Sequence, residues 1–296
     1  MFNNVLIGVD DGDGGRDAIA LARLLAADGA QLTFAHVYQG DSAVSRASNP
    51  DYEAFQHDRI RKLSEKLRQE EGIEADLRWR GSPSVGRGLH ELAEITEADL
   101  LVVGSSRRSL LGRVLIGDDT NAALNGAMCA VAIAPAGYSV EPQSMREVGV
   151  GYDGSVESER ALELARIIAA EHHTKLSAFQ AVSIPAYMYL GAPAPVDVEP
   201  IEHVVQHARE RLAELGGAEV HAAYGDPVEE LTLYSASLDL LVVGSRGYGP
   251  IGRLVHGSTS QKLARTARCP LLVLTRSARM ETDGAEDGSA TMAATG

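Results

Sequence analysis

The chain repeats itself with a period of about 140 residues. The segment ADLLVVGSS at residues 98–106 returns as LDLLVVGSR at residues 238–246, and CAVAIA at 129–134 returns as CPLLVL at 269–274. At nearly the same spacing, VLIGVDDG is matched by VGVGYDGS. Periods of roughly 20–50 residues are typical of solenoids and propellers, whereas a period this long indicates two copies of a whole domain.

The two copies are expected to span residues 1–137 and 146–276. The segment between them, PAGYSVEPQS, carries two prolines, one glycine and two serines, as a linker does. Residues 277–296 are small and polar and offer almost nothing to bury, so we expect a disordered tail.

Strand and helix patterns alternate along each copy. In the second copy the expected strands are Glu147–Tyr152, Lys175–Val182, Glu219–Tyr224, Leu238–Gly244 and Pro270–Thr275, and the expected helices are Glu157–His172, Glu199–Leu215, one opened by Asp226 and Pro227, and one near Ser258–Thr266. The runs LLVVG and LLVL are apolar at every position, which suits strands buried on both faces of a parallel sheet. The pattern predicts an α/β fold with two tandem doubly wound, five-stranded parallel sheets flanked by helices.

The last strand of each copy, CAVAIA or CPLLVL, is expected at an edge of its sheet. Because an exposed apolar edge invites association, we expect these two strands to meet, so that the chain forms an intramolecular pseudo-dimer. Further association into a homodimer is a weaker expectation.

Charge and composition exclude several classes of function. A net charge of −14 argues against broad binding to nucleic acid or to an anionic membrane surface. No apolar run approaches the roughly 18 residues that a membrane span needs, and the start MFNNVLIGVDDGDGG does not resemble a signal peptide. Two cysteines supply no disulfide framework, and we therefore expect a cytoplasmic protein.

A glycine-rich loop follows the fourth strand of the second copy. It reads GSRGYGPIGRLVHGS at residues 244–258 and leads into a helix. Glycines allow backbone N–H groups to approach an anion, and a helix start adds further N–H groups with partial positive charge. The loop matches neither the Walker pattern nor the dinucleotide fingerprint, and a long structural turn is the alternative interpretation.

The pattern G-x-x-G, nine residues, then G-[S/T] after a fourth strand resembles the nucleotide-binding signature of the universal stress protein family. The resemblance covers both copies and is supported by an aspartate that ends the first strand of each, Asp10 and Asp153. It implies an α/β sandwich of five parallel strands per copy, with ATP bound at the carboxyl ends of the strands in members that carry the glycines.

The resemblance also implies a set of binding residues, all in the second copy. Gly151 and Asp153 would lie by the ribose and adenine, Val182 would line the base pocket, and Val243 and Gly244 would flank the nucleoside. Gly247, Gly257, Ser258 and Thr259 would meet the phosphates, with Arg253 nearby. Asp153 could equally close a turn or cap a helix, and Arg253 could pair with a carboxylate.

The first copy carries an altered loop, GSSRRSLLGRVLIGD at residues 104–118. Arg107 replaces the second glycine and Asp118 replaces the serine. A carboxylate at that place would repel a triphosphate, so we expect the first site to be degraded or altered.

No metal site and no catalytic residue is expected. The acidic run DDGDGGRD resembles a calcium loop, but the acid required twelve residues in is replaced by Leu21 or Ala22. We find neither a His/Cys cluster with ligand spacing nor a nucleophile beside a base.

The leading hypothesis is a stress-response regulatory protein that holds ATP, with or without Mg²⁺, in its second copy. Its partner would be an adenine nucleotide, and neither nucleic acid nor membrane. A slow ATPase or phosphotransferase is one alternative, although no Walker B acid is present. A scaffold for protein interactions, with a purely structural loop, is the other.

Overall fold

The computed structural model describes residues 1–10, 12–39, 51–72, 75–105, 124, 127–140, 144–183, 198–245 and 259–275. In the first half the elements are β1 (Phe2–Gly8), α1 (Asp13–Leu25), β2 (Ala26–Gln39), α3 (Asp51–Glu71), β3 (Asp76–Ser82), α4 (Val85–Ile95), β4 (Leu100–Gly104), β5 (Ala130–Ala134) and the 3-10 turn η1 (Tyr138–Val140). In the second half they are β6 (Glu147–Gly151), α6 (Val156–Glu171), β7 (Lys175–Val182), α7 (Val198–Glu214), β8 (Glu219–Tyr224), α8 (Pro227–Tyr234), the 3-10 turn η3 (Ser235–Ser237), β9 (Leu240–Gly244), α9 (Thr259–Thr266) and β10 (Leu271–Leu274). The tail expected at 277–296 lies outside these residues.

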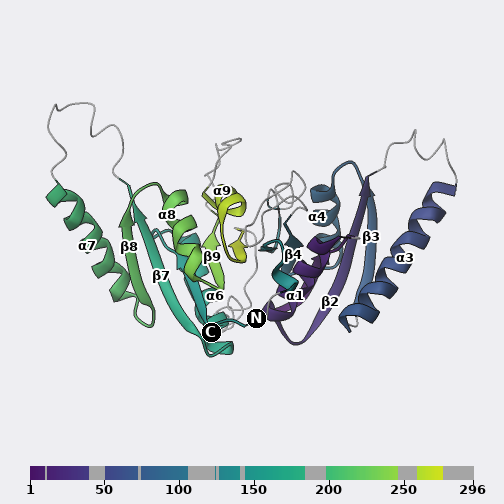
Figure 1. Cartoon of the computed structure of the whole chain (residues 1–296), viewed down its shortest axis with the longest axis horizontal. Coiled ribbons are helices and arrows are strands. Elements are labelled where there is room, and N and C mark those ends of the chain that lie inside the picture. Colours follow the sequence, from purple (N-terminus) through teal and green to yellow (C-terminus); the bar gives the residue numbers. More distant parts are fainter. Residues whose placement is uncertain are drawn as a thin grey trace, which may run out of the picture.

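The described strands form one continuous ten-stranded sheet. Its order is β3-β2-β1-β4-β5-β10-β9-β6-β7-β8, so each half contributes five parallel strands in the same relative order. The α/β fold with two doubly wound parallel halves is therefore confirmed. Helices cover both faces of the sheet, with α1 and α6 on one side and α4, α8 and α9 on the other (Figure 1).

The two halves join through their fifth strands. β5 and β10 are antiparallel, and Ala132 lies opposite Leu272. This pairing confirms the expectation that the two strands meet. A side-chain bond reinforces it, because the Thr275 hydroxyl donates to the Cys129 carbonyl at 2.9 Å across the junction. A ring nitrogen of His172, at the end of α6, also lies 2.8 Å from the carbonyl of Leu24 near the end of α1.

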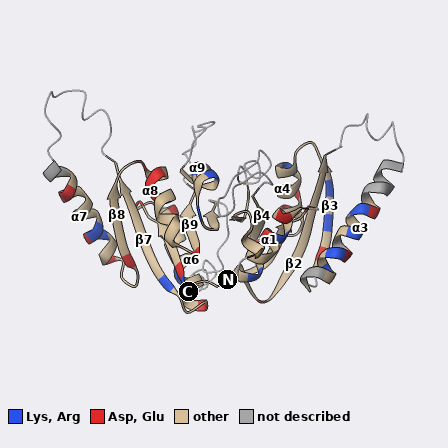
Figure 2. Cartoon of the chain, in the orientation of Figure 1, with Lys and Arg blue, Asp and Glu red and all other residues tan. Residues whose placement is uncertain are grey.

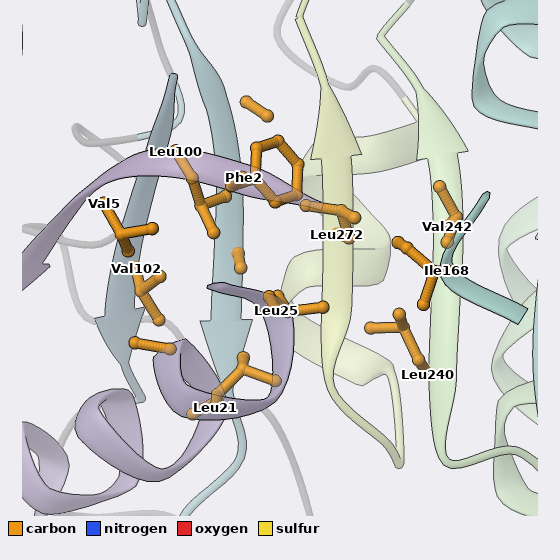
Figure 3. Close-up of a cluster of buried hydrophobic side chains, with 14 of the residues drawn as sticks. Phe2, Val5, Leu21, Leu25, Leu100, Val102, Ile168, Leu240, Val242 and Leu272 are labelled. Carbon is orange, nitrogen blue, oxygen red and sulfur yellow. The ribbon is translucent and has the colours of Figure 1, made fainter. Parts of the chain in front are cut away.

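The hydrophobic core runs through the junction without a break. On the α1 and α6 face, Leu21 and Leu25 share one cluster of buried side chains with Ile168 and with Leu240 and Leu272 of the second half (Figure 3). Each such side chain contributes about 1.5–3 kcal/mol by leaving water. Charged residues gather on the helices, and the inner strands carry almost none (Figure 2). The two halves consequently share one core rather than two separate ones.

An aspartate before the fourth strand of each half fixes the start of that half's first strand. The Asp239 carboxylate accepts the backbone N–H groups of Arg146 and Glu147 at 2.8 and 3.0 Å. Asp99 does the same for Asn3 and Asn4 at 2.7 and 3.1 Å. The repeated dipeptide Asp-Leu in ADLLVVG and LDLLVVG is thus explained by the fold.

Some expected strand boundaries shift by a residue or two. β9 begins at Leu240 rather than Leu238, because Ser235–Ser237 form a 3-10 turn that delays the strand. Asp226 caps α8 as expected, with its carboxylate accepting the N–H groups of Val228 and Glu229. Among the described residues, no helix is both long and apolar enough to cross a bilayer.

Candidate functional site in the second half

A pocket of about 260 Å³ opens at the carboxyl ends of β6, β7 and β9. β6 and β9 are neighbours in the sheet. The helix that follows β6, α6, lies on one face of the sheet, and the helix that follows β9, α9, lies on the opposite face. This is a point where strand order reverses, and open α/β sheets bind ligands at such points. The described lining residues are Gly151, Tyr152, Asp153, Ser155, Ser158, Phe179, Ala181, Ser183, Pro227, Leu231, Val243, Gly244, Thr259, Ser260 and Leu263.

Glycine at the end of β9 lets the first turn of α6 approach the strand. A Cβ placed on Gly244 would lie 2.5 Å from the carbonyl oxygen of Glu157, so any side chain there would push α6 away. Gly104 has the same relation to α1 in the first half, where an added Cβ would clash with the carbonyl oxygen of Gly14. Both glycines are therefore required by helix packing, whether or not a ligand binds.

Asp153 shapes the entry into α6. Its carboxylate oxygen Oδ1 accepts hydrogen bonds from the Ser155 N–H at 2.9 Å and from the Ser155 hydroxyl. Ser155 is the N-cap of α6, and its side chain accepts the N–H of Ser158 at 3.3 Å. Asp153 thus closes the turn before the helix while also lining the pocket.

One side of the pocket is apolar. Phe179, Ala181, Leu231, Val243 and Leu263 belong to the hydrophobic cluster on the α8 and α9 face of the sheet. The Phe179 ring stacks on Tyr234, with centroids 4.8 Å apart and an interplanar angle of 24°. Burial raises the pKa of Tyr234 well above its ordinary value, so its hydroxyl keeps its proton even at alkaline pH where an exposed phenol ionises.

The other side of the pocket is rich in hydroxyl groups. Ser155 and Ser158 come from the start of α6, Thr259 and Ser260 from the start of α9, and Ser183 from the end of β7. A helix start carries partial positive charge and unpaired N–H groups, which favours anions. Of the described lining residues only Asp153 is charged. The arrangement fits a ligand with one flat apolar part and one polar, anionic part.

The structure brings five of the ten predicted binding residues into this pocket. They are Gly151, Asp153, Val243, Gly244 and Thr259. Gly247, Arg253, Gly257 and Ser258 lie outside the described residues. The side chain of Val182 does not line the pocket, because strand alternation places it on the opposite sheet face from Phe179 and Ala181.

Sequence reasoning missed most of the pocket wall. Phe179 and Ala181 lie three residues and one residue before Val182, and their side chains project from the opposite face of the same strand. Ser155 carried a visible signal, since a serine directly before a first turn rich in acidic residues is typical of a helix N-cap. Leu231 and Leu263 had none, because they resemble any other core leucine.

The corresponding region of the first half is built differently. Ala35 occupies the strand position of Phe179, since each pairs with the glycine that ends the first strand of its half. Leu92 stands eight residues after the α4 cap, where α8 has Tyr234. An added Cβ on Gly88 of α4 would lie 2.5 Å from Val37, so this helix packs tightly on β2. Arg107 and Asp118 lie outside the described residues.

Metal-binding side chains do not gather anywhere in the described part of the chain. No group of three or more His, Cys, Asp or Glu residues is arranged there to hold an ion. The two cysteines are free thiols and both are buried.

Comparison with known proteins identifies relatives of the whole chain. The universal stress protein family matches residues 1–135 and again residues 145–275. Universal stress protein Rv2005c of Mycobacterium tuberculosis is 29% identical over 293 residues, which is 93% of this chain and 98% of that protein. A universal stress protein from Archaeoglobus fulgidus has a similar fold, with a TM-score of 0.68 at 19% identity, covering 93% of this chain and 98% of that one. A solved universal stress protein in complex with cAMP is 30% identical, covers 45% of this chain and 98% of that chain, and has a TM-score of 0.32.

Proposed function

The chain belongs to the universal stress protein family through both of its halves, and on that premise we propose that its second half binds one adenine nucleotide, ATP, as a regulatory ligand. The observation that carries this proposal is the pocket at the strand-order reversal between β6 and β9. Its apolar side suits a base, and its hydroxyl side at two helix starts suits phosphates.

The proposed contacts follow the two sides of the pocket. Gly151 and Asp153 lie by the ribose and the base, and Val243 and Gly244 flank the nucleoside. Thr259 begins α9, and with Gly247, Gly257 and Ser258 it meets the phosphates, while Arg253 lies nearby. Where Mg²⁺ accompanies the phosphates, it supplies charge neutralisation there.

We propose that the nucleotide acts through the conformation of the protein rather than through fast chemistry. Asp153 is the charged group among the described lining residues, and its Oδ1 already accepts two hydrogen bonds from Ser155. A general base must be within hydrogen-bond reach of the proton it removes and poised to accept it. Hydrolysis of ATP is therefore at most slow.

We also propose that the first half does not bind ATP. On β2 the larger Val37 takes the strand position that Ala181 has on β7, and Ala35 offers no aromatic surface. The sequence adds Arg107 and Asp118 in place of a glycine and a serine. For the compartment we propose the cytoplasm, where free buried thiols stay reduced.

Calorimetry of the purified full chain with ATP tests the proposal. We expect close to one site per chain, together with adenine nucleotide among the small molecules released from the purified protein and identified by mass spectrometry. Failure of ATP, ADP and AMP to bind at millimolar concentration would overturn the nucleotide proposal. Two equivalent sites would overturn the asymmetry alone, and turnover far above background would favour an ATPase instead.

A further inference from the structure

A short pile of aromatic rings stands beneath the pocket. The Tyr234 hydroxyl lies 2.6 Å from the hydroxyl of Ser177 on β7, so the tyrosine ring sits at the level of that residue. Phe179 is two residues further along the strand and stacks on Tyr234. The pile therefore rises along β7 toward the carboxyl end of the sheet.

Hydrogen bonds hold the base of the pile in place. The Ser177 hydroxyl donates to Glu147 at 3.0 Å, which leaves its oxygen to accept the proton of Tyr234. Gly149 makes room for the tyrosine, because an added Cβ would lie 2.8 Å from its hydroxyl oxygen. With Tyr234 fixed on one face, Phe179 has little freedom to turn.

The next level above Phe179 is open and belongs to the pocket. Two residues of a strand advance by about 6.6–6.8 Å, and the residue that follows on this face is the small Ala181. Phe179, Ala181 and Ser183 all line the pocket, with Leu231 and Val243 beside them. The spacing is enough to place one more flat ring above Phe179 at stacking distance.

We propose that Phe179 supplies the stacking surface for the base of the bound nucleotide, so that a planar heterocycle continues the pile begun by Tyr234 and Phe179. This inference rests on the proposed function and names the residue that selects for a ligand with an aromatic base. Tyr234 acts through Phe179 and is a positioning residue. The first half has Ala35 and Leu92 at the corresponding positions and therefore lacks the pile.

An ordinary core role for Phe179 makes a different prediction. The side chain is 7% exposed and belongs to a buried cluster, so shortening it lowers stability in either case. Only a stacking role makes the loss of ligand affinity depend on whether the ligand carries a base. The test therefore compares ATP with inorganic tripolyphosphate, which has the phosphates alone.

The experiment measures both ligands on the wild-type chain and on Phe179→Leu. We expect ATP to bind about five- to fiftyfold more weakly to the variant, as loss of base–aromatic stacking commonly causes, and tripolyphosphate affinity to change less than twofold. Phe34→Leu removes a fully buried ring from the strand β2 of the first half and should leave both affinities unchanged. The fluorescence of etheno-ATP, quenched by stacking in the wild type, should recover in bound Phe179→Leu.

Each other outcome has a defined meaning. If the wild type binds ATP and Phe179→Leu binds it within twofold, or loses both ligands in parallel, the stacking role is overturned and the proposed function survives. If the wild type binds neither ligand, the proposed function itself fails. Tyr234→Leu, which removes the support but leaves Phe179, should weaken ATP by a few-fold and spare tripolyphosphate.

Discussion

Asp17 of α1 holds Ser139 of the segment between the halves by two hydrogen bonds. The carboxylate oxygen Oδ1 accepts both the N–H and the hydroxyl of Ser139, each at 2.8 Å, while Oδ2 accepts the N–H of Gly137 at 2.9 Å. Asp17 is 1% exposed, so these bonds satisfy a buried carboxylate.

Replacing this carboxylate should therefore be costly. Asp17→Ala leaves two backbone N–H groups without their acceptor, and we expect the free energy of unfolding to fall by about 3 kcal/mol. Urea denaturation at neutral pH measures the change. Arg160→Ala is the matched control, since Arg160 is exposed at the corresponding position of α6, and its effect should stay within about 0.5 kcal/mol. Equal effects of the two substitutions would contradict this account of Asp17.

Asp99 and Asp239 should stabilise the starts of β1 and β6 independently of each other. Asp99→Ala and Asp239→Ala each remove the acceptor of two backbone N–H groups, and each should cost about 2 kcal/mol. β4 and β9 are separated by two strands, a distance of roughly 14 Å, so the two losses should add in the double variant. Denaturation of both single variants and the double variant tests this, and strong non-additivity would speak against it.

Alkaline pH should destabilise the fold through buried thiol and phenol groups. Burial, with a smaller contribution from the charge of Asp99, raises the pKa of Cys129 from 9.0 to about 11. Burial also raises the pKa of Cys269, Tyr138 and Tyr234. An unfolded thiol loses its proton near pH 9, whereas the folded Cys129 keeps it to about pH 11. The contribution of this thiol to the free energy of unfolding is therefore fully present below pH 9 and is lost as pH rises from 9 to 11.

Comparing the wild type with Cys129→Ala isolates the contribution of one thiol. Between pH 8 and pH 10.5 the stability of the wild type should fall more than that of the variant, by about 2 kcal/mol. Urea denaturation at the two pH values gives both slopes. Identical slopes would mean that Cys129 titrates normally in the folded protein.

Ser258→Ala tests the glycine loop. If the hydroxyl bonds a charged phosphate, ATP affinity should drop about ten- to a hundredfold. Ser84→Ala is the control, because Ser84 caps α4 in the first half by accepting the Arg87 N–H at 3.3 Å. That variant should lose about 1 kcal/mol of stability and keep its ATP affinity. A lower melting temperature with unchanged ATP affinity in Ser258→Ala would identify the loop as a structural connector.

The sequence predicted the architecture well because its strands and caps are local signals. β7 and β8 span the expected Lys175–Val182 and Glu219–Tyr224, and Asp226 caps α8 as its position before proline suggests. The joining of the fifth strands could also be foreseen, since an apolar edge needs a partner.

The pocket wall could not be predicted from the sequence with the same success. β7 is buried on both faces, with Ala178 packed on one side and Phe179 on the other, so its sequence lacks the alternation that would reveal the pocket face. Resemblance suggested Val182, whereas the structure places Ala181 and Ser183 in the pocket. The sequence left open whether Asp153 closes a turn or caps the helix, and in the structure it closes the turn while Ser155 caps α6.

Joining two copies in one chain has a consequence for their divergence. In a symmetric pair of separate subunits, every substitution appears twice and must be tolerated in both places. Here the β5–β10 junction is made within one polypeptide, so each half changes alone and their association does not depend on protein concentration. Corresponding positions of the two halves now differ in chemistry, as Asp17 and Arg160 do, and as Ala35 and Phe179 do. Because the two halves are covalently linked, a substitution in one half does not require the same substitution in the other.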